Sequence, residues 1–260
     1  MIKDEYIIPE KMQRKKHKKS RFIELDFLRG FAIAHMIILH LLWDLNYYGI
    51  FNFFPVIQKT NIIVQIMFFT IVGICLSIGF NKTDENKREK LYLHLLKRGA
   101  WIFSLGLVIT AVTLVFMPDR PIILGVLHCI GLCIILSIPF LKFQNKNIII
   151  ANILIISGII IGSFNFQNPT LLHLLIGFHP ADLWTYTIDY FPLLPWLGVT
   201  LLGVSIGNIL YSGNERRFKL PDLSVFHSIR FVSWLGRNSL IIYLIHQPFI
   251  VAVLTLYLII

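Results

Sequence analysis

Residues 21–52 read RFIELDFLRGFAIAHMIILHLLWDLNYYGIFN, and their middle is an apolar run long enough to cross a membrane as a helix. The same run carries Arg29, His35, His40 and Asp44. An Arg or Asp at the centre of a bilayer costs roughly 2.5–3.5 kcal/mol, and a residue of that cost inside a span is by default a candidate for function. The stretch therefore predicts a transmembrane helix that carries chemistry.

The composition of the whole chain is also that of a membrane protein. Of its 260 residues, 56% are hydrophobic and only 15% are charged, and the mean hydropathy is +0.71. Apolar runs of spanning length recur along the chain, and the last is interrupted near its start by Gly-Arg-Asn at residues 236–238. The fold class is therefore all-α, a polytopic membrane helical bundle of about seven transmembrane helices. The predicted spans are residues 27–46, 61–80, 92–117, 122–141, 148–164, 190–211 and 232–259.

The net charge of +10 is distributed unevenly between the connections. The outer connections hold only Lys59 and Arg120 as cations, while Lys and Arg crowd into residues 1–26, 81–91, 142–147 and 212–231. The positive-inside rule then places the amino terminus inside and the carboxyl terminus outside, in the cell (cytoplasmic) membrane. Since this distribution accounts for the charge, no nucleic acid is expected as a partner.

The predicted spans and the charge distribution divide the chain into two parts. Residues 1–20 are predicted to form a basic cytoplasmic tail that lies against anionic membrane lipid, and residues 21–260 a single transmembrane domain. Residues 165–190 are too apolar for a free loop and too broken for a span, which favours a re-entrant or interfacial segment. The pairs Gly158/Gly162 and Gly203/Gly207 predict helix packing faces and leave monomer and homodimer open.

Three ionisable residues of the first helix share one face. His40 and Asp44 are one turn apart, and Arg29 precedes His40 by close to three whole turns. His35 points about 140° away and is predicted to be a packing partner. Arg29 lies near the inner boundary, with His40 about 16 Å further out. A carboxylate one turn from an imidazole can fix its tautomer and raise its basicity, as a general base or an acyl-accepting nucleophile requires.

Polar residues on other spans extend this candidate site. His128, in PIILGVLHCIGL, lies at a depth similar to that of His40, and His246, in GRNSLIIYLIHQPF, lies near the middle of its span. Asp189 and Tyr190 begin the motif DYFPLLPW at the outer mouth. These side chains could line one cavity, with Asp189, Tyr190 and His246 at the substrate mouth. A lone membrane histidine is also often only a hydrogen-bond partner between helices.

Arginines near the inner side suit an anionic donor. Arg29, Arg98 and Arg237 all fall at that level. The guanidinium group binds phosphate in two-point fashion, so these residues could hold the phosphates of a cytoplasmic donor. The alternative is that they anchor the helices by reaching the lipid interface.

No metal is expected, because no His-x-x-x-His or His-Glu-x-x-His pair lies within one helix. The three cysteines, Cys75, Cys129 and Cys133, all lie in apolar spans and are predicted to be small buried hydrophobic residues.

A series of motifs carries a family resemblance. They are ELDFLRGFAIAHMIILHLLWDLNYYG, FFTIVGICLSIGF, LLKRGAWIFSLGL, ILGVLHCIGL, DYFPLLPWLGVTLLGVSIG and GRNSLIIYLIHQP. Their order resembles the prokaryotic branch of the heparan-alpha-glucosaminide N-acetyltransferase catalytic-domain family, from about residue 21 to the end of the chain. The spacing of Arg29 and His40 is also similar to that in a second membrane acyltransferase family, which O-acylates surface polysaccharides.

The resemblance implies an integral membrane acyltransferase. Such an enzyme moves an acetyl group from cytoplasmic acetyl-CoA to a saccharide or lipid-linked acceptor, as an amine or hydroxyl, at the outer face. In the lysosomal enzyme the acetyl-transferring histidine lies in the outer loop after the first span, and the corresponding loop here, residues 46–60, has none. His40 therefore becomes the candidate, with Asp44 and His128 beside it. The alternative function is a transporter or flippase that moves an anionic or acylated solute without covalent chemistry.

Overall fold

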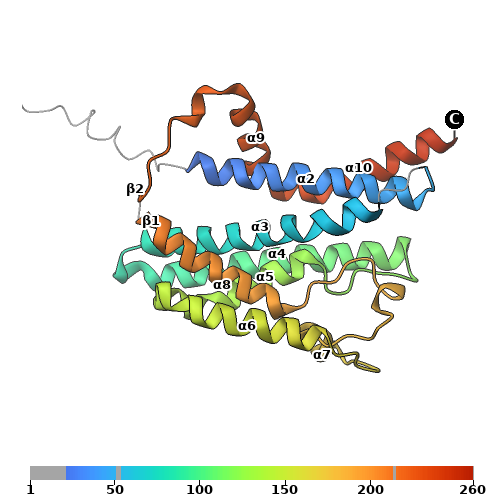
Figure 1. Cartoon of the computed structure of the whole chain (residues 1–260), viewed down its shortest axis with the longest axis horizontal. Helices are drawn as coiled ribbons and strands as arrows, with labels where there is room; N and C mark the ends of the chain where they lie inside the picture. Colours follow the sequence, from blue (N-terminus) through green and yellow to red (C-terminus); the bar gives the residue numbers. More distant parts are fainter. Residues whose placement is uncertain (1–21, 51–53, 213–214, 260) are drawn as a thin grey trace, which may run out of the picture.

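The computed structural model describes residues 22–50, 54–212 and 215–259. Its long helices lie side by side along one axis (Figure 1). The predicted basic tail, residues 1–20, falls outside the described residues. The helices are α2 (Ile23–Tyr47), α3 (Phe54–Asn81), η2 (Glu85–Lys87), α4 (Arg88–Phe116), α5 (Val126–Ser137), η3 (Ile138–Lys146), α6 (Asn147–Gly162), α7 (Leu171–Ile176), η4 (Leu183–Thr185), α8 (Leu193–Leu210), η5 (Leu223–Val225), α9 (His227–Arg237) and α10 (Ser239–Ile259). The strands are β1 (Tyr211–Ser212) and β2 (Glu215–Arg216), which pair antiparallel.

The predicted all-α membrane bundle is confirmed. Six helical stretches are long and apolar enough to cross a membrane. One of them, Val126–Gly162, contains the fourth and fifth predicted spans, because η3 joins α5 to α6 without a break in helical structure. The number of crossings and the side on which the amino terminus lies stay predictions.

Charged connections gather at one end of the bundle. The start of α2, η2, η3 and the β1–β2 hairpin lie at the left in Figure 1, and the connections after α4 and α6 lie at the right with the carboxyl terminus. The left end carries Lys87, Arg88, Lys142, Lys146 and Arg216, whereas the α4–α5 connection at the right carries Arg120. The positive-inside prediction would place this left end in the cytoplasm.

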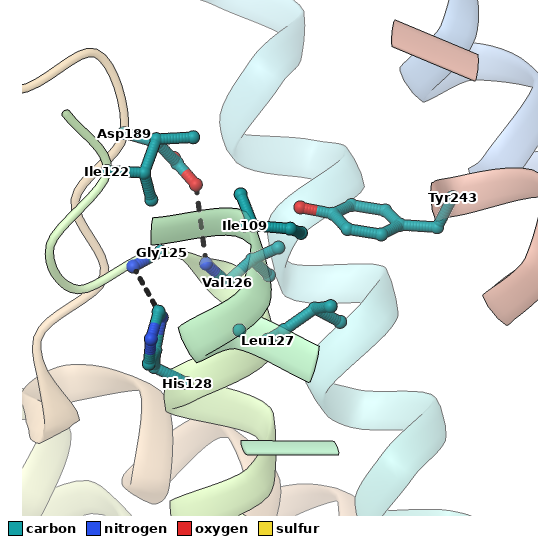
Figure 2. Close-up of a pocket in the computed structure, with 9 residues that line it drawn as sticks. Ile109, Ile122, Gly125, Val126, Leu127, His128, Asp189 and Tyr243 are labelled. Atoms are coloured by element: carbon teal, nitrogen blue, oxygen red, sulfur yellow. Dashed lines mark hydrogen bonds between the residues drawn. The ribbon is translucent and has the colours of Figure 1, made fainter. Parts of the chain in front are cut away.

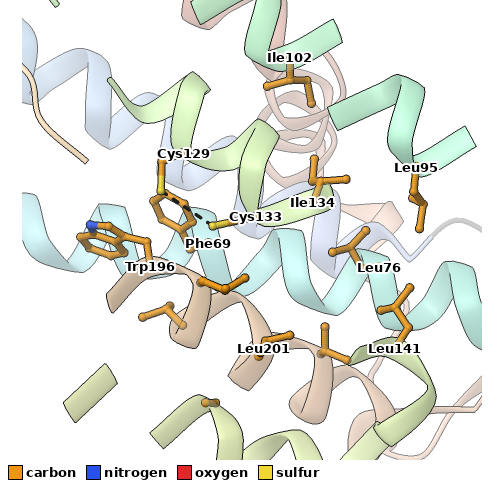
Figure 3. Packing of buried hydrophobic residues seen from close by; sticks show 14 of the residues in the cluster. Phe69, Leu76, Leu95, Ile102, Cys129, Cys133, Ile134, Leu141, Trp196 and Leu201 are labelled. Atoms are coloured by element: carbon orange, nitrogen blue, oxygen red, sulfur yellow. Dashed lines mark hydrogen bonds between the residues drawn. The ribbon is translucent and has the colours of Figure 1, made fainter. Parts of the chain in front are cut away.

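Helix α8 is the centre of the packing. It packs against α3 and α6 along its length, and 61% of its span is buried, against 17% for the spans of α4 and α10. Phe69 of α3 stacks on Trp196 of α8 with ring centroids 4.8 Å apart, at the edge of the main core cluster (Figure 3). Cys129 and Cys133 lie buried in the same cluster, as predicted for them.

Close helix contacts explain most of the small-residue pairs. A Cβ on Gly203 would lie 2.3 Å from the carbonyl oxygen of Thr70, and one on Gly207 would lie 2.7 Å from Cβ of Ser77. Gly158 approaches the backbone at Pro195 in the same way, while Gly162 meets nothing within 4 Å. Three of the four predicted glycines therefore sit at helix contacts.

The last predicted span divides into two helices. Residues 232–237 belong to α9, and α10 begins at Ser239, after Asn238 leaves the helical conformation at φ −103° and ψ 13°. A Cβ on Gly236 would lie 1.8 Å from the carbonyl oxygen of Asp26, so α9 packs backbone to backbone on α2. Asn238 thus lets the chain leave this contact and start a separate helix beside α2 (Figure 1).

The broken segment between α6 and α8 is ordered. It contains α7 and η4, and a bridge between Asn165 and His179 closes it into a compact unit at the right end of the bundle (Figure 1). The hydroxyl of Tyr190 donates a 2.6 Å hydrogen bond to the carbonyl oxygen of Leu174, which ties the end of the segment to α7.

Candidate functional site

Two predicted histidines from opposite ends of the chain meet inside the bundle. His40 on α2 and His246 on α10 have ring centroids 4.8 Å apart, with the planes at 66°, so one ring meets the other edge to face. His40 is half-buried and His246 is 8% exposed. The structure thus joins a residue predicted to be catalytic with one predicted for the substrate mouth.

Asp44 is held by a residue that the sequence did not single out. Its carboxylate accepts hydrogen bonds of 3.1 and 3.0 Å from the side-chain amide of Gln247 and is 2% exposed. Among the described residues, no hydrogen bond or ion pair joins Asp44 to His40. The position of Gln247 directly after His246 in the motif IHQP is the only sequence signal for this contact.

His246 has a defined tautomer. Its Nδ1 lies 2.6 Å from the carbonyl oxygen of Tyr243. Because a carbonyl oxygen only accepts hydrogen bonds, Nδ1 carries the hydrogen, and the neutral ring then leaves a lone pair on Nε2. Within the described structure Nε2 is buried and has no hydrogen-bond partner. A buried basic nitrogen without a partner is suited to accept a proton or an acyl group.

A second cluster forms where α5 begins. The Asp189 carboxylate points inward and accepts a 3.3 Å hydrogen bond from the backbone N–H of Val126 (Figure 2). Burial raises the pKa of Asp189 from its usual 3.8 to about 7, against the opposing effect of the hydrogen bonds from the Val126 and Tyr190 N–H groups. The group is therefore poised to change protonation near neutral pH.

His128 lies in the same cluster, but both of its ring nitrogens are used. Nδ1 accepts a 3.2 Å hydrogen bond from the N–H of Gly125 (Figure 2). Nε2 lies 3.4 Å from the Thr110 hydroxyl. That hydroxyl in turn donates to the carbonyl oxygen of Ile122. His128 thereby joins α4 to the connection that leads into α5, so it supports this end of the bundle.

Tyr243 connects the two clusters. Its ring lines a small cavity, of about 10 Å³, with Asp189 and His128 (Figure 2). That space is about the least that holds one water-sized group. The carbonyl oxygen of Tyr243 accepts the hydrogen bond from His246. Sequence reasoning missed Tyr243, although its position three residues before His246 places both on one side of α10.

The three candidate arginines have different surroundings. Arg29 donates to the carboxylate of Asp26 at 3.0 Å and to the Cys75 sulfur at 3.1 Å, and its side chain is 23% exposed. Arg237 is exposed at the end of α9, directly after the glycine that contacts α2. Arg98 is exposed on α4, which packs mainly on α5. The structure thus brings Arg29 and Arg237 to one helix crossing and leaves Arg98 on a different helix pair.

An ion pair at the charged end joins the start of α2 to the chain that follows α8. Arg216 donates to both carboxylate oxygens of Glu24, at 2.6 and 2.7 Å, and Tyr211 adds a 3.2 Å hydrogen bond to the same group. The pair joins the first turn of α2 to the β1–β2 hairpin that follows α8. It was not predicted, because the partners are 192 residues apart and each resembles an ordinary surface charge in the sequence.

Comparison with known protein families identifies a match over most of the chain. A model of the family described as "Heparan-alpha-glucosaminide N-acetyltransferase, catalytic" matches residues 21–248. No curated protein and no solved structure matches the chain. Among the described residues, no group of three His, Cys, Asp or Glu side chains could hold a metal ion.

Proposed function

The chain belongs to the heparan-alpha-glucosaminide N-acetyltransferase catalytic family, and from this premise we propose how it moves an acetyl group. Membership indicates a membrane acetyltransferase. The proposal is that acetyl-CoA donates from the cytoplasmic side of the cell membrane and that an amine or hydroxyl of a saccharide or lipid-linked acceptor receives the group at the outer side.

The observation that carries the proposal is the contact between His40 and His246. Two imidazoles that meet at 4.8 Å between spanning helices are costly to bury and are hard to explain by packing alone. Arg29 lies on the same stripe of α2, about 16 Å nearer the charged end. This arrangement supports a donor whose anionic part stays at the charged end while its thioester reaches the histidines.

At the charged end, Arg29 would bind the phosphates of acetyl-CoA together with Arg237. The Arg29 side chain is 23% exposed and Arg237 is exposed. Both residues lie at the crossing of α2 and α9, which suits this role. Arg98 remains a candidate for the same phosphates, but its place on α4 supports this role less. Binding by two guanidinium groups would be charge-assisted and specific for phosphate oxygens.

At the reacting end, His40 would either accept the acetyl group or take the proton of the acceptor as it attacks. In both routes a nucleophile attacks the thioester carbonyl carbon, the carbon–sulfur bond breaks and CoA leaves as the thiol. Asp44 would act through Gln247, which holds α10 so that His246 lies against His40. His128 would stabilise the developing oxyanion or assist proton transfer only if its Thr110 contact opened. Asp189 and Tyr190 would form the acceptor mouth.

The test is label transfer by purified protein in sealed vesicles with the charged end outward. The vesicles receive acetyl-CoA labelled in the acetyl group, with glucosamine as the acceptor, and His40→Ala is run in parallel. Label on the protein or on the sugar, absent in the variant, would support the proposal. Uptake of an unchanged solute without release of CoA would favour a transporter instead.

A further inference from the structure

The small cavity where α5 begins brings a carboxylate and a phenol to opposite walls. Asp189 enters it from the connection before α8 and Tyr243 enters it from α10, with the Tyr243 hydroxyl pointing toward the side of the Asp189 carboxylate (Figure 2). The two groups are near enough to interact electrostatically, and the hydroxyl is buried. The cavity volume of about 10 Å³ is about the least that holds one water.

The hydroxyl of Tyr243 differs from the other titratable groups around Asp189, because it has no hydrogen-bond partner within the described part of the chain. His128 uses both ring nitrogens, the Tyr190 hydroxyl donates to a backbone carbonyl oxygen, and so does the Cys129 thiol. A buried hydroxyl without a partner is unfavourable. One water hydrogen-bonded to both Tyr243 and Asp189 would satisfy it.

The same tyrosine holds His246. Its carbonyl oxygen accepts the 2.6 Å hydrogen bond from Nδ1 of His246, and the two rings have centroids 5.5 Å apart. Helix α10 needs such support, because only 17% of its span is buried. Tyr243 and Gln247 lie about one turn apart on α10, and Gln247 is already bound to Asp44. A second polar contact, at Tyr243, would therefore fix the turn of α10 that carries His246 at both of its ends.

We propose that Tyr243 is a positioning residue for acetyl transfer, held by Asp189 through one water in this cavity. Asp189 is itself fixed to α5, because its carboxylate accepts from the N–H of Val126. The contacts then run from Asp189 through the water and Tyr243 to His246, whose ring meets that of His40. A reacting imidazole needs a further group of this kind to orient it. The inference rests on the proposed acetyl transfer and adds to it a residue that acts through His246.

The water bridge can be tested without catalysis. The probe is the infrared carbonyl band of Asp189 at pH 5, where the carboxyl group keeps its proton because burial raises its pKa to about 7. The band is assigned by its loss in Asp189→Asn. Tyr243→Phe keeps the ring and removes only the hydroxyl, so we expect it to shift this band. The matched control is Tyr257→Phe, the same change on the same helix at a side chain that is 71% exposed. An unchanged band in Tyr243→Phe would overturn the inference.

The positioning role is tested by the kinetics of acetyl transfer from acetyl-CoA to glucosamine. Tyr243→Phe should lower kcat about tenfold, roughly the effect of one hydrogen bond, and leave KM for acetyl-CoA within about twofold of wild type. Tyr257→Phe should change neither. A shifted infrared band with an unchanged kcat, or an equal loss of kcat in Tyr257→Phe, would overturn the positioning role. No transfer by the wild-type protein would instead refute the proposed function, and the infrared band would still decide whether the bridge exists.

Discussion

The carboxylate of Asp44 on α2 accepts both of its hydrogen bonds from the side-chain amide of Gln247 on α10, at 3.1 and 3.0 Å. Helix α10 is otherwise loosely held, since only 17% of its span is buried. His246 is the residue before Gln247, and its ring contacts the ring of His40. His40 is one turn from Asp44 on α2. The Asp44–Gln247 contact therefore sets the register in which the two imidazoles meet.

Asp44→Asn should keep the fold, whereas Asp44→Ala should destabilise it by about 1.5–3 kcal/mol, the range for hydrogen bonds to charged groups. An asparagine still accepts from Gln247, and its own amide can donate to the Gln247 Oε1, which is buried without a partner in the described structure. Thermal unfolding in detergent measures both variants. Equal losses for the two would mean that the charge, and not the hydrogen bond, holds α10.

Acetyl transfer by Asp44→Asn should stay within about threefold of wild type, because a residue that acts through Gln247 loses little when the contact is kept. A folded Asp44→Asn protein without activity would show instead that the carboxylate acts directly on His40. The Asp44→Ala protein serves as the comparison, since it loses the contact altogether.

Gly236→Ala should prevent α9 from docking on α2. The added Cβ would lie 1.8 Å from the carbonyl oxygen of Asp26, a backbone atom that cannot turn aside. The expected loss of stability is above the roughly 1–3 kcal/mol of ordinary overpacking. Gly79→Ala in α3 is the control, because its Cβ would meet nothing within 4 Å and alanine is the better helix former. Similar unfolding temperatures for the two variants would contradict this account.

Helix positions were predictable because an apolar run of spanning length has few alternatives. The first span was expected at residues 27–46, and α2 covers Ile23–Tyr47. The early start was missed because Glu24 resembles a solvated residue until Arg216, far along the chain, is seen to pair with it. Pairing between distant residues leaves no local periodicity in the sequence.

For the candidate residues, the sequence predicts positions along a single helix better than contacts between helices. Helical spacing put Arg29, His40 and Asp44 on one stripe, and that spacing holds in α2. It could not show that Asp44 reaches across to Gln247 of α10 or that His128 contacts Thr110 of α4, because the helix spacing of a single span says nothing about the neighbouring helix. Tyr243 was overlooked for the same reason.

Stability should fall as pH rises from about 4 to about 7, in part because of Asp189. Burial raises the pKa of this carboxyl from 3.8 to about 7, so the folded protein keeps a proton that the unfolded chain releases in this interval. Its contribution is fully present below pH 4 and is lost as pH passes 7. Between pH 5 and pH 8 the unfolding temperature should change less with pH in Asp189→Asn than in wild type. An identical slope in both proteins would assign the pH dependence to other groups.

Arg216→Gln should destabilise more than the double variant Glu24→Gln/Arg216→Gln. The single change leaves a largely buried carboxylate without its bidentate partner, while the double change leaves two neutral amides that can bond to each other. A double-mutant cycle in unfolding free energy, completed with Glu24→Gln, measures the coupling. Coupling below about 0.5 kcal/mol would mean that the pair behaves as an exposed one.

His128→Ala should lower stability more than it lowers acetyl transfer per folded molecule, and His40→Ala should do the reverse. The reason is that His128 accepts from the Gly125 N–H and contacts Thr110, whereas His40 has only the ring of His246 among its described contacts. His128→Asn separates the two roles, because the asparagine oxygen can take the place of Nδ1 and accept from Gly125. Recovery of the unfolding temperature in His128→Asn, with transfer near the wild-type rate, is the expected result. A stable His128→Asn protein that transfers no label would show that the imidazole itself takes part in the reaction, and the reacting centre would then lie in the cluster of Asp189 and Tyr243.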